Sequence, residues 1–230
     1  MKPILLFDID GTLLHVKREF LREVINQILT EFKFTSNNVK NRSFAGRTDR
    51  DIFMELIYDH TGSHDLFDEV TSRYKNLMNE SLSPDAVDII PGAAEFVEFA
   101  KSEGYEMGLC TGNFREVAYA KVESAGMGND FSFGGFGCDH QERKHLPGLA
   151  SRSYRNLYAE EAPSEAFVVI GDTPNDIQSA KYFNAKSVGV TTGHFGADEL
   201  RANSPDLLVD SLDEIPENLS QLGFTKASRM

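Results

Sequence analysis

The sequence predicts an α/β protein in which a doubly wound parallel sheet carries an inserted bundle of helices. Short apolar runs, at residues 4–7, 107–111 and 166–171, alternate with stretches whose apolar residues recur at helical spacing. Each of these three runs ends in polar residues. About ninety residues separate the first run from the second, too many for a simple crossover connection, and this length implies an inserted domain.

The first apolar run, residues 4–7, leads directly into two carboxylates, Asp8 and Asp10. Side chains two positions apart in a strand share a face, and Gly11 then breaks the strand. Two like charges this close are costly to bury unless a metal ion or a shared proton offsets their repulsion. The pair therefore indicates a divalent cation site with an attacking group beside it. The alternative, that an acid caps a helix beginning near Val16, needs only one of the two.

The inserted segment is expected to form helices, because its apolar residues recur every three or four positions. These residues are Phe20, Leu21, Val24, Ile25, Ile28 and Phe32, then Ile52, Phe53, Leu56 and Ile57, then Leu66, Phe67, Val70, Tyr74 and Leu77. Such stripes favour core packing over a cofactor site. We expect the helical domain to span about residues 15–85, with residues 1–14 and 86–230 forming the core domain.

The second apolar run places a hydroxyl, a glycine and an amide at its end, from Thr111, Gly112 and Asn113. A threonine hydroxyl and the free backbone amides at the start of a helix can hold phosphate oxygens. Alternatively, Asn113 is a plain N-cap and Thr111 an ordinary strand residue. The segment taken alone leaves both interpretations open.

The third apolar run ends in an acidic loop. Thr173, Pro174 and Asp176 fit the N-cap, the first helical position and the acid of a capping box, which leaves Asp172 unexplained. Open parallel sheets bind ligands outside the carboxyl ends of their strands. Three strands that end in polar residues of these types therefore indicate ligand binding at this end of the sheet.

The remaining elements fit the same architecture. Further short strands are expected at residues 130–136, 186–190 and 206–209, and amphipathic helices at residues 93–101, 117–125, 146–157 and 177–183. Right-handed crossovers between such strands give a parallel sheet covered on both faces.

The three polar strand ends together resemble the motifs of the haloacid dehalogenase superfamily of phosphotransferases. The first matches in the D-x-D-G-T pattern at residues 8–12, followed by Leu13, and the others appear in order at residues 111–113 and 171–176. The resemblance implies a Rossmann-like sheet of strand order 5-4-1-2-3. It also implies a helical cap inserted after the first motif, as in phosphoglycolate phosphatases and β-phosphoglucomutases.

The resemblance also implies a role for each motif residue. Asp8 would attack phosphorus to form an aspartyl phosphate, and Asp10 would protonate the leaving oxygen and then activate water. Mg²⁺ would be held by Asp8, the backbone carbonyl of Asp10, and Asp172. Asp176 would orient the metal's surroundings as well as cap its helix. Oxygens of the phosphoryl group would be held by Thr111, Gly112 and Asn113.

A fourth motif residue, a cation that binds phosphate, has two candidates. Arg143 and Lys144 both precede a predicted helix, without the commoner Lys-Pro pairing of the family. We favour Arg143, because its guanidinium can bind phosphate through two hydrogen bonds. Either side chain could instead be an exposed charge on the first helical turn.

The loop Phe44 to Asp49 also has two interpretations. It resembles the cap loop that faces the active site in phosphoglycolate phosphatases, which would bring Arg47 to the leaving group or to a second anionic group of the substrate. Alternatively, Gly46 turns the chain, Thr48 or Asp49 caps the next helix, and Arg47 is solvated.

The resemblance favours hydrolysis of a small-molecule phosphate monoester. The dehalogenases of the superfamily lack the second aspartate, which is Asp10 here. The alternative is a phosphomutase of the β-phosphoglucomutase type, although Phe20 stands where that pattern has histidine. A catalytically idle binding protein of the same fold is a further alternative, against which the intact motif residues weigh. The sequence does not name the substrate.

Composition limits the partners and the compartment. The formal net charge of −13 disfavours nucleic acid as a partner, because such binding depends on basic side chains. No apolar run approaches the length of a membrane span, and the chain enters a strand without a signal segment. The two cysteines, Cys110 and Cys138, form no disulfide framework. We therefore expect a cytoplasmic protein, as a monomer or small homo-oligomer, with a small phosphate ester as its ligand.

Overall fold

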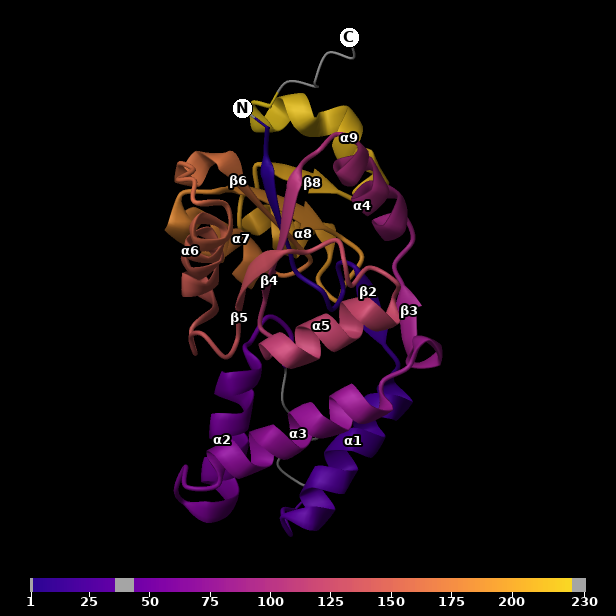
Figure 1. Ribbon diagram of the computed structural model, residues 1–230, viewed down its shortest axis with the longest axis vertical. Coiled ribbons are helices and arrows are strands. Elements are labelled where there is room, and N and C mark those ends of the chain that lie inside the picture. The colour runs from indigo at the N-terminus through magenta and orange to yellow at the C-terminus, as the bar shows by residue number, and fades with distance from the viewer. Residues whose placement is uncertain (1, 36–43, 225–230) are drawn as a thin grey trace.

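The computed structural model describes residues 2–35 and 44–224. A sheet flanked by helices forms one end of the molecule, and three long helices gather at the other (Figure 1). The sheet has six strands in the order β5-β4-β1-β6-β7-β8, and every paired strand in it runs parallel to its neighbour. The strands are β1 (Ile4–Phe7), β4 (Glu106–Thr111), β5 (Phe133–Phe136), β6 (Phe167–Gly171), β7 (Lys186–Val190) and β8 (Leu207–Val209).

The predicted fold class is confirmed. In chain order the six strands lie as 6-5-4-1-2-3, which contains the expected order of five. The order of five left out β8, the strand expected at residues 206–209, which lies beside β7 at the edge of the sheet. The strand expected at residues 130–136 is shorter and begins at Phe133.

Helices cover both faces of the sheet. They are α4 (Ala93–Ser102), α5 (Arg115–Ser124), α6 (Leu146–Tyr158), α7 (Pro174–Phe183), α8 (Ala197–Ala202) and α9 (Ile215–Asn218). Short 3₁₀ turns lie at Pro84–Ala86, Arg143–His145, Ser164–Ala166, Leu212–Glu214 and Leu219–Leu222.

The central strand β1 is buried on both sides, because its side chains alternate between two cores. Leu5 and Phe7 join a cluster that includes residues of α4 and α5. Ile4 and Leu6 join a second cluster with residues of α6 and α7. Burial on both faces explains why the run that precedes the acidic pair is wholly apolar.

The inserted segment forms the helices α1 (Arg18–Glu31), α2 (Asp49–Thr61) and α3 (Phe67–Ser81). Their apolar faces share a third cluster, which includes Val24, Ile57 and Tyr74. Phe114 and Val117, at the start of α5, complete this cluster from the core side. The helix α5 therefore lies between the sheet and the bundle, as Figure 1 shows. Domain boundaries at residues 14/15 and 85/86 stay a prediction.

The two chain passages between the sheet and the bundle form a small antiparallel ribbon. It consists of β2 (Leu14–Val16) and β3 (Val87–Ile89). Val16 thus lies in a strand, and the helix that we expected to begin near it starts at Arg18.

In the described part of the chain, none of the helices combines the length and the apolar character that crossing a lipid bilayer requires. The expected cytoplasmic location and oligomeric state stay predictions.

Candidate active site

Three polar strand ends meet because their strands are neighbours. The strand β1 lies between β4 and β6, with Phe7 paired to Leu109 on one side and to Ile170 on the other. Asp8 directly follows β1, and Asp172 directly follows β6. Segments more than a hundred residues apart in the chain are thereby brought to one edge of the sheet.

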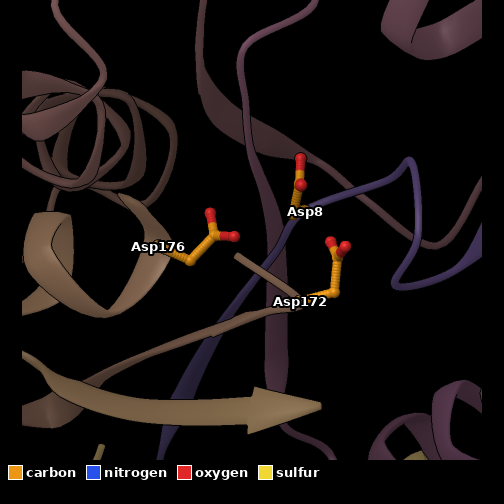
Figure 2. A group of neighbouring side chains, drawn as sticks. All are labelled: Asp8, Asp172 and Asp176. Atoms are coloured by element: carbon orange, nitrogen blue, oxygen red, sulfur yellow. The ribbon is translucent and has the colours of Figure 1, made fainter. Parts of the chain in front are cut away.

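Three carboxylates gather at this edge (Figure 2). Asp8, Asp172 and Asp176 each offer an oxygen, and these oxygens lie within 4.8 Å of one another. The residues are 4%, 4% and 1% exposed. Burial raises the pKa of Asp8 to about 6, with Arg143 opposing the rise. Burial and the charges of Asp8 and Asp176 raise the pKa of Asp172 to about 8. Ionising these acids together is therefore unfavourable in the buried site, even beside Arg143.

The backbone leaves little room around Asp172. Gly11 has a φ of +87°, and a Cβ there would overlap the Asp172 carboxylate. A Cβ at Gly193 would overlap the same group. The Thr12 hydroxyl donates to Asp172 Oδ1 at 3.3 Å, and that of Thr192 donates to the carbonyl of Gly11 at 2.6 Å. The turn after the acidic pair therefore fits closely around this carboxylate.

Arg143 is the basic side chain that reaches these acids. Its Nη2 lies 2.8 Å from Asp8 Oδ2 and 2.5 Å from Asp176 Oδ1, and the residue is buried. Burial alone would lower the pKa of Arg143, but the charges of Asp176 and Asp8 outweigh it and hold that pKa above its usual range. Lys144, the other candidate, is half-exposed and pairs with Glu142 at 2.7 Å. The structure thus brings Arg143, and not Lys144, to the candidate nucleophile.

Asp176 has two sets of partners. The predicted capping box is present: Thr173 accepts from the amide of Asp176, whose Oδ2 accepts from the amide and hydroxyl of Thr173 at 3.0 and 2.7 Å. Its Oδ1 accepts from Arg143. Both oxygens are therefore engaged by protein donors, which fits an outer position around a metal better than a direct one.

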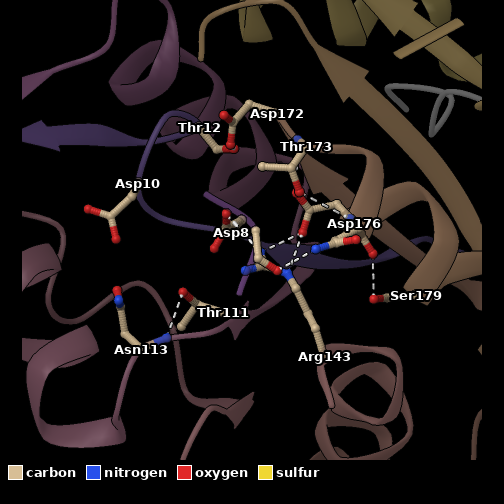
Figure 3. Close-up of polar contacts among 12 residues, drawn as sticks. Asp8, Asp10, Thr12, Thr111, Asn113, Arg143, Asp172, Thr173, Asp176 and Ser179 are labelled. Atoms are coloured by element: carbon tan, nitrogen blue, oxygen red, sulfur yellow. Dashed lines mark hydrogen bonds and ion pairs between the residues drawn. The ribbon is translucent and has the colours of Figure 1, made fainter. Parts of the chain in front are cut away.

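Asp10 and Asn113 occupy the other side of the site. In Figure 3 the carboxylate of Asp10 is turned away from Asp8 and lies on the side of Asn113. The Asp10 side chain is 43% exposed and is not part of the group of three carboxylates. Thr111 is buried at the end of β4 and accepts from the amide of Asn113 at 3.4 Å. Asn113 is not the N-cap of α5, because that position is Phe114 and carries no side-chain cap.

Sequence reasoning missed Lys121. This buried lysine of α5 lies 2.5 Å from Asp10 Oδ2, and it donates to Asn113 Oδ1 at 3.0 Å. The helical pattern of α5 contained a signal for it. Val117, Ala118 and Val122 mark the buried face of this helix, and Lys121 lies on the same face. A charged residue on an apolar face signals a buried partner, because an unpaired buried charge is very costly.

The cap touches the second motif through backbone and side chain alike. The amide of Asp49 donates to the carbonyl of Gly112 at 2.7 Å, and the Asp49 carboxylate accepts from the amide of Phe114 at 2.8 Å. A Cβ at Gly112 would overlap the carbonyl oxygen of Arg47, so this close approach requires glycine. Burial raises the pKa of Asp49 to about 6, with the Lys121 charge opposing the rise.

The Arg47 side chain is not brought to Asp8. It pairs with Asp51 at 2.7 Å and with Glu55 at 2.5 Å, both on the helix α2 that follows the loop. It lines a polar cavity of about 860 Å³ beside the cap loop, and Asp8 and Asp10 are not among the residues that line this cavity. Thr48 caps α2, as one of the two interpretations of this loop expected.

The acidic group suits a hard divalent cation. Carboxylate oxygens are the ligands that Mg²⁺ prefers, and two of these three buried acids have pKa values raised by burial. A bound cation would offset their mutual repulsion. The donor set therefore fits the metal that the motifs imply.

Comparison with known proteins agrees with this geometry. Residues 5–190 match the family described as haloacid dehalogenase-like hydrolase. A protein named "Probable phosphatase IndB" from Dickeya dadantii is 28% identical over 222 residues, covering 94% of this chain and 92% of that protein. A phosphoglycolate phosphatase from Nitrosococcus oceani is 29% identical over 135 residues, 58% of each chain.

The fold has a solved counterpart in a β-phosphoglucomutase from Clostridium difficile. The two structures align with a TM-score of 0.71 at 17% identity, covering 97% of this chain and 98% of that one. At this identity the likeness concerns the fold alone. The family match, which spans most of the chain and all three polar strand ends, confirms the resemblance inferred from the motifs: the chain belongs to the haloacid dehalogenase-like hydrolases.

Proposed function

We propose that the protein is a Mg²⁺-dependent phosphatase that hydrolyses a small-molecule phosphate monoester through an aspartyl phosphate on Asp8. The observation that carries the proposal is the buried contact between Arg143 and Asp8, at 2.8 Å, beside two further carboxylates. A cation against a nucleophilic carboxylate orients it and offers donors to an arriving phosphate. The names of the two curated relatives support a phosphatase.

The proposed first step is attack by Asp8 on phosphorus. A pKa near 6 leaves this carboxyl group mostly ionised at neutral pH, as a nucleophile must be. Asp10 gives its proton to the leaving oxygen, and Arg143, Thr111 and the amides after β4 hold the phosphoryl oxygens. Mg²⁺, held by Asp8, the Asp10 carbonyl and Asp172, would neutralise charge between the nucleophile and the phosphate.

In the second step Asp10, now ionised, takes a proton from water as that water attacks the phosphorus of the aspartyl phosphate. The bond between Asp8 and phosphorus breaks, which restores the carboxylate and releases inorganic phosphate. Dividing the displacement in two lets one enzyme carboxylate serve as the temporary acceptor.

The alternative is a phosphomutase, in which the phosphoryl group returns to the sugar. Phe20 argues against it, because its ring packs against two apolar clusters and has no group that can transfer a proton. An idle binding protein is the other alternative. Its weakness is that burying several carboxylates together serves no binding role without a cation.

The test is a screen of small phosphate esters, including phosphoglycolate, sugar phosphates and an aryl phosphate, with and without Mg²⁺. We expect release of inorganic phosphate that requires Mg²⁺ and is lost in Asp8→Asn. With an aldose 1-phosphate and a bisphosphate primer, formation of the 6-phosphate isomer faster than phosphate release would establish the mutase. No turnover of any ester would favour the idle protein.

A further inference from the structure

Lys121 is a buried lysine for which the motifs provide no role. It projects from α5, and its side chain is 4% exposed. Withdrawing an ammonium group from water costs several kcal/mol unless charge and hydrogen bonds compensate for it. The compensation comes from Asp10 Oδ2 at 2.5 Å and Asn113 Oδ1 at 3.0 Å. Lys121 thus links the proposed acid–base residue to the loop of the second motif.

The surroundings of Lys121 extend across the seam between cap and core. Asp49 of α2 accepts from the amide of Phe114 at 2.8 Å. Burial raises the pKa of its carboxyl group, the charge of Lys121 opposes this rise, and the charge of Asp10 adds to it. Tyr74 of α3 is buried near the same two acids, which add to the rise of its pKa caused by burial. Lys121 therefore pairs with a carboxylate of the core, and its charge also acts on a carboxylate of the cap.

The orientation of Asp10 depends on this contact. Asp10 follows β1 in a turn, and its side chain is 43% exposed, so packing leaves its carboxylate freedom to rotate. Figure 3 shows this carboxylate on the side of Asn113, whereas Arg143 and Asp176 lie on the other side of Asp8. A group that must deliver a proton to one oxygen needs a fixed place, because a misplacement of about 1 Å can cost about a hundredfold in rate.

We propose that Lys121 is a positioning residue, whose ammonium group holds the Asp10 carboxyl group on the cap side of the site, where the leaving oxygen of the bound ester lies. The proposal rests on the function proposed above, in which Asp10 is the acid and base. The ester P–O bond breaks as the proton passes from Asp10 to the leaving oxygen. Lys121 acts through Asp10 and does not itself transfer the proton.

Substrates with different leaving groups test this role. An alkyl phosphate needs protonation of its leaving oxygen, whereas p-nitrophenolate leaves without it. Lys121→Met keeps the length of the side chain and removes its charge, and the half-exposed Asp10 then remains solvated. We expect kcat/KM to fall about a hundredfold for the alkyl ester, the range of a lost acid–base contribution, and less than about tenfold for p-nitrophenyl phosphate. KM should change little for either ester.

Lys75→Met is the matched control. Lys75 lies at the same seam, where it pairs with Glu116 of the same helix α5 at 3.2 Å and lies over the ring of Phe114, and neither partner is a proposed catalytic residue. It should leave the ratio of the two rates unchanged. If Lys121→Met does not fold, Lys121→Gln, which keeps a hydrogen-bond donor there without the charge, supplies the same comparison.

A double-mutant cycle with Asp10→Asn tests whether Lys121 affects the rate through Asp10. If Lys121 acts through Asp10, adding Lys121→Met to Asp10→Asn should slow single-turnover cleavage of the alkyl ester by less than about threefold, because interacting sites are not additive. Equal losses on both esters, or fully additive losses in the cycle, would overturn the proposal and make Lys121 a structural or phosphate-binding residue. An Asp10→Asn variant with full activity on the alkyl ester would instead overturn the proposed function.

Discussion

Arg143 and Lys121 are both buried cations in contact with a carboxylate of the first motif, yet their surroundings differ. Arg143 lies between Asp8 and Asp176, which are almost fully buried. Lys121 lies between Asp10, which is 43% exposed, and the amide oxygen of Asn113. The first cation belongs to the group of acids at the ends of β1 and β6, and the second belongs to the seam with the cap.

The comparison divides the candidate site into two sides. The buried acidic side is formed by Asp8, Asp172, Asp176 and Arg143, and in the proposed function it would hold the metal and supply the attacking group. The cap side is formed by Asp10, Asn113 and Lys121, and in the proposals above it would act on the leaving group. Substitutions on the buried side should affect every substrate and the metal, whereas those on the cap side should depend on the leaving group.

The largest expected effect tests the buried side. Arg143→Met should lower kcat/KM for every ester by about a thousandfold, because it removes donors to the phosphate and leaves Asp8 and Asp176 without their cation. It should also destabilise the fold by about 3–5 kcal/mol, as loss of one partner of a buried ion pair does. Steady-state kinetics and denaturant unfolding measure the two effects.

Lys144→Met is the control for that change. Its ammonium group is half-exposed and pairs with the exposed carboxylate of Glu142, so we expect a loss below about threefold. If Lys144→Met were the more damaging of the two, the assignment of Arg143 as the phosphate-binding cation would be wrong.

The next effect separates two acids of the buried side. Asp172→Ala should raise the Mg²⁺ concentration that gives half-maximal activity far more than Asp176→Ala does. The reason is that both oxygens of Asp176 already accept from Arg143 and Thr173, which leaves Asp172 as the more available ligand. Titrations of activity against Mg²⁺ would measure the difference, and equal shifts would mean that the two acids share the metal.

The dependence of folding stability on pH should show a smaller effect, which comes from Asp172. Without metal, the folded-state pKa of Asp172 is raised to about 8 from an ordinary value of 3.8, so the folded protein holds a proton that the unfolded chain has released. Stability from this group is therefore lost as pH rises from about 4 to about 8. Mg²⁺ favours the ionised acid, so the rise in Tm on adding Mg²⁺ should be greater at pH 8 than at pH 6.

Asp172→Asn is the control for the pH effect. In the metal-free protein it should raise Tm at pH 8 by a few degrees, because about 1 kcal/mol corresponds to roughly 2–4 °C for a chain of this size. It should also remove most of the rise caused by Mg²⁺. If Mg²⁺ raised Tm by the same amount at both pH values, no acid with a raised pKa would be coupled to the metal.

The smallest expected effect concerns the cap loop. Arg47→Ala should change kcat for a simple aryl phosphate by less than about threefold, because its guanidinium pairs with Asp51 and Glu55 of the following helix α2. A large rise in KM for a substrate with a second anionic group would instead show that Arg47 leaves these partners when the substrate binds. The same kinetics on an aryl phosphate and on phosphoglycolate distinguish the two results.

The division into two sides also explains what the sequence could predict. Asp8, Thr111 and Asp172 could be found because each directly ends a buried parallel strand, where ligands bind. Lys121 could not be assigned a partner, because its contact with Asp10 joins residues 111 positions apart and depends on how α5 packs. The surroundings of Arg47 were equally undecided, since a loop side chain can turn to the helix that follows it or to the site.

The most direct test of the account is to locate the covalent phosphate. Asp10→Asn, which should slow breakdown of the intermediate, would be mixed with Mg²⁺ and an aryl phosphate, quenched in acid, digested and sequenced by mass spectrometry. The account predicts a hydroxylamine-sensitive phosphate on Asp8, absent from the Asp8→Asn variant of the same protein. Phosphate on any other residue, or rapid turnover by Asp8→Asn without a labelled enzyme, would contradict it.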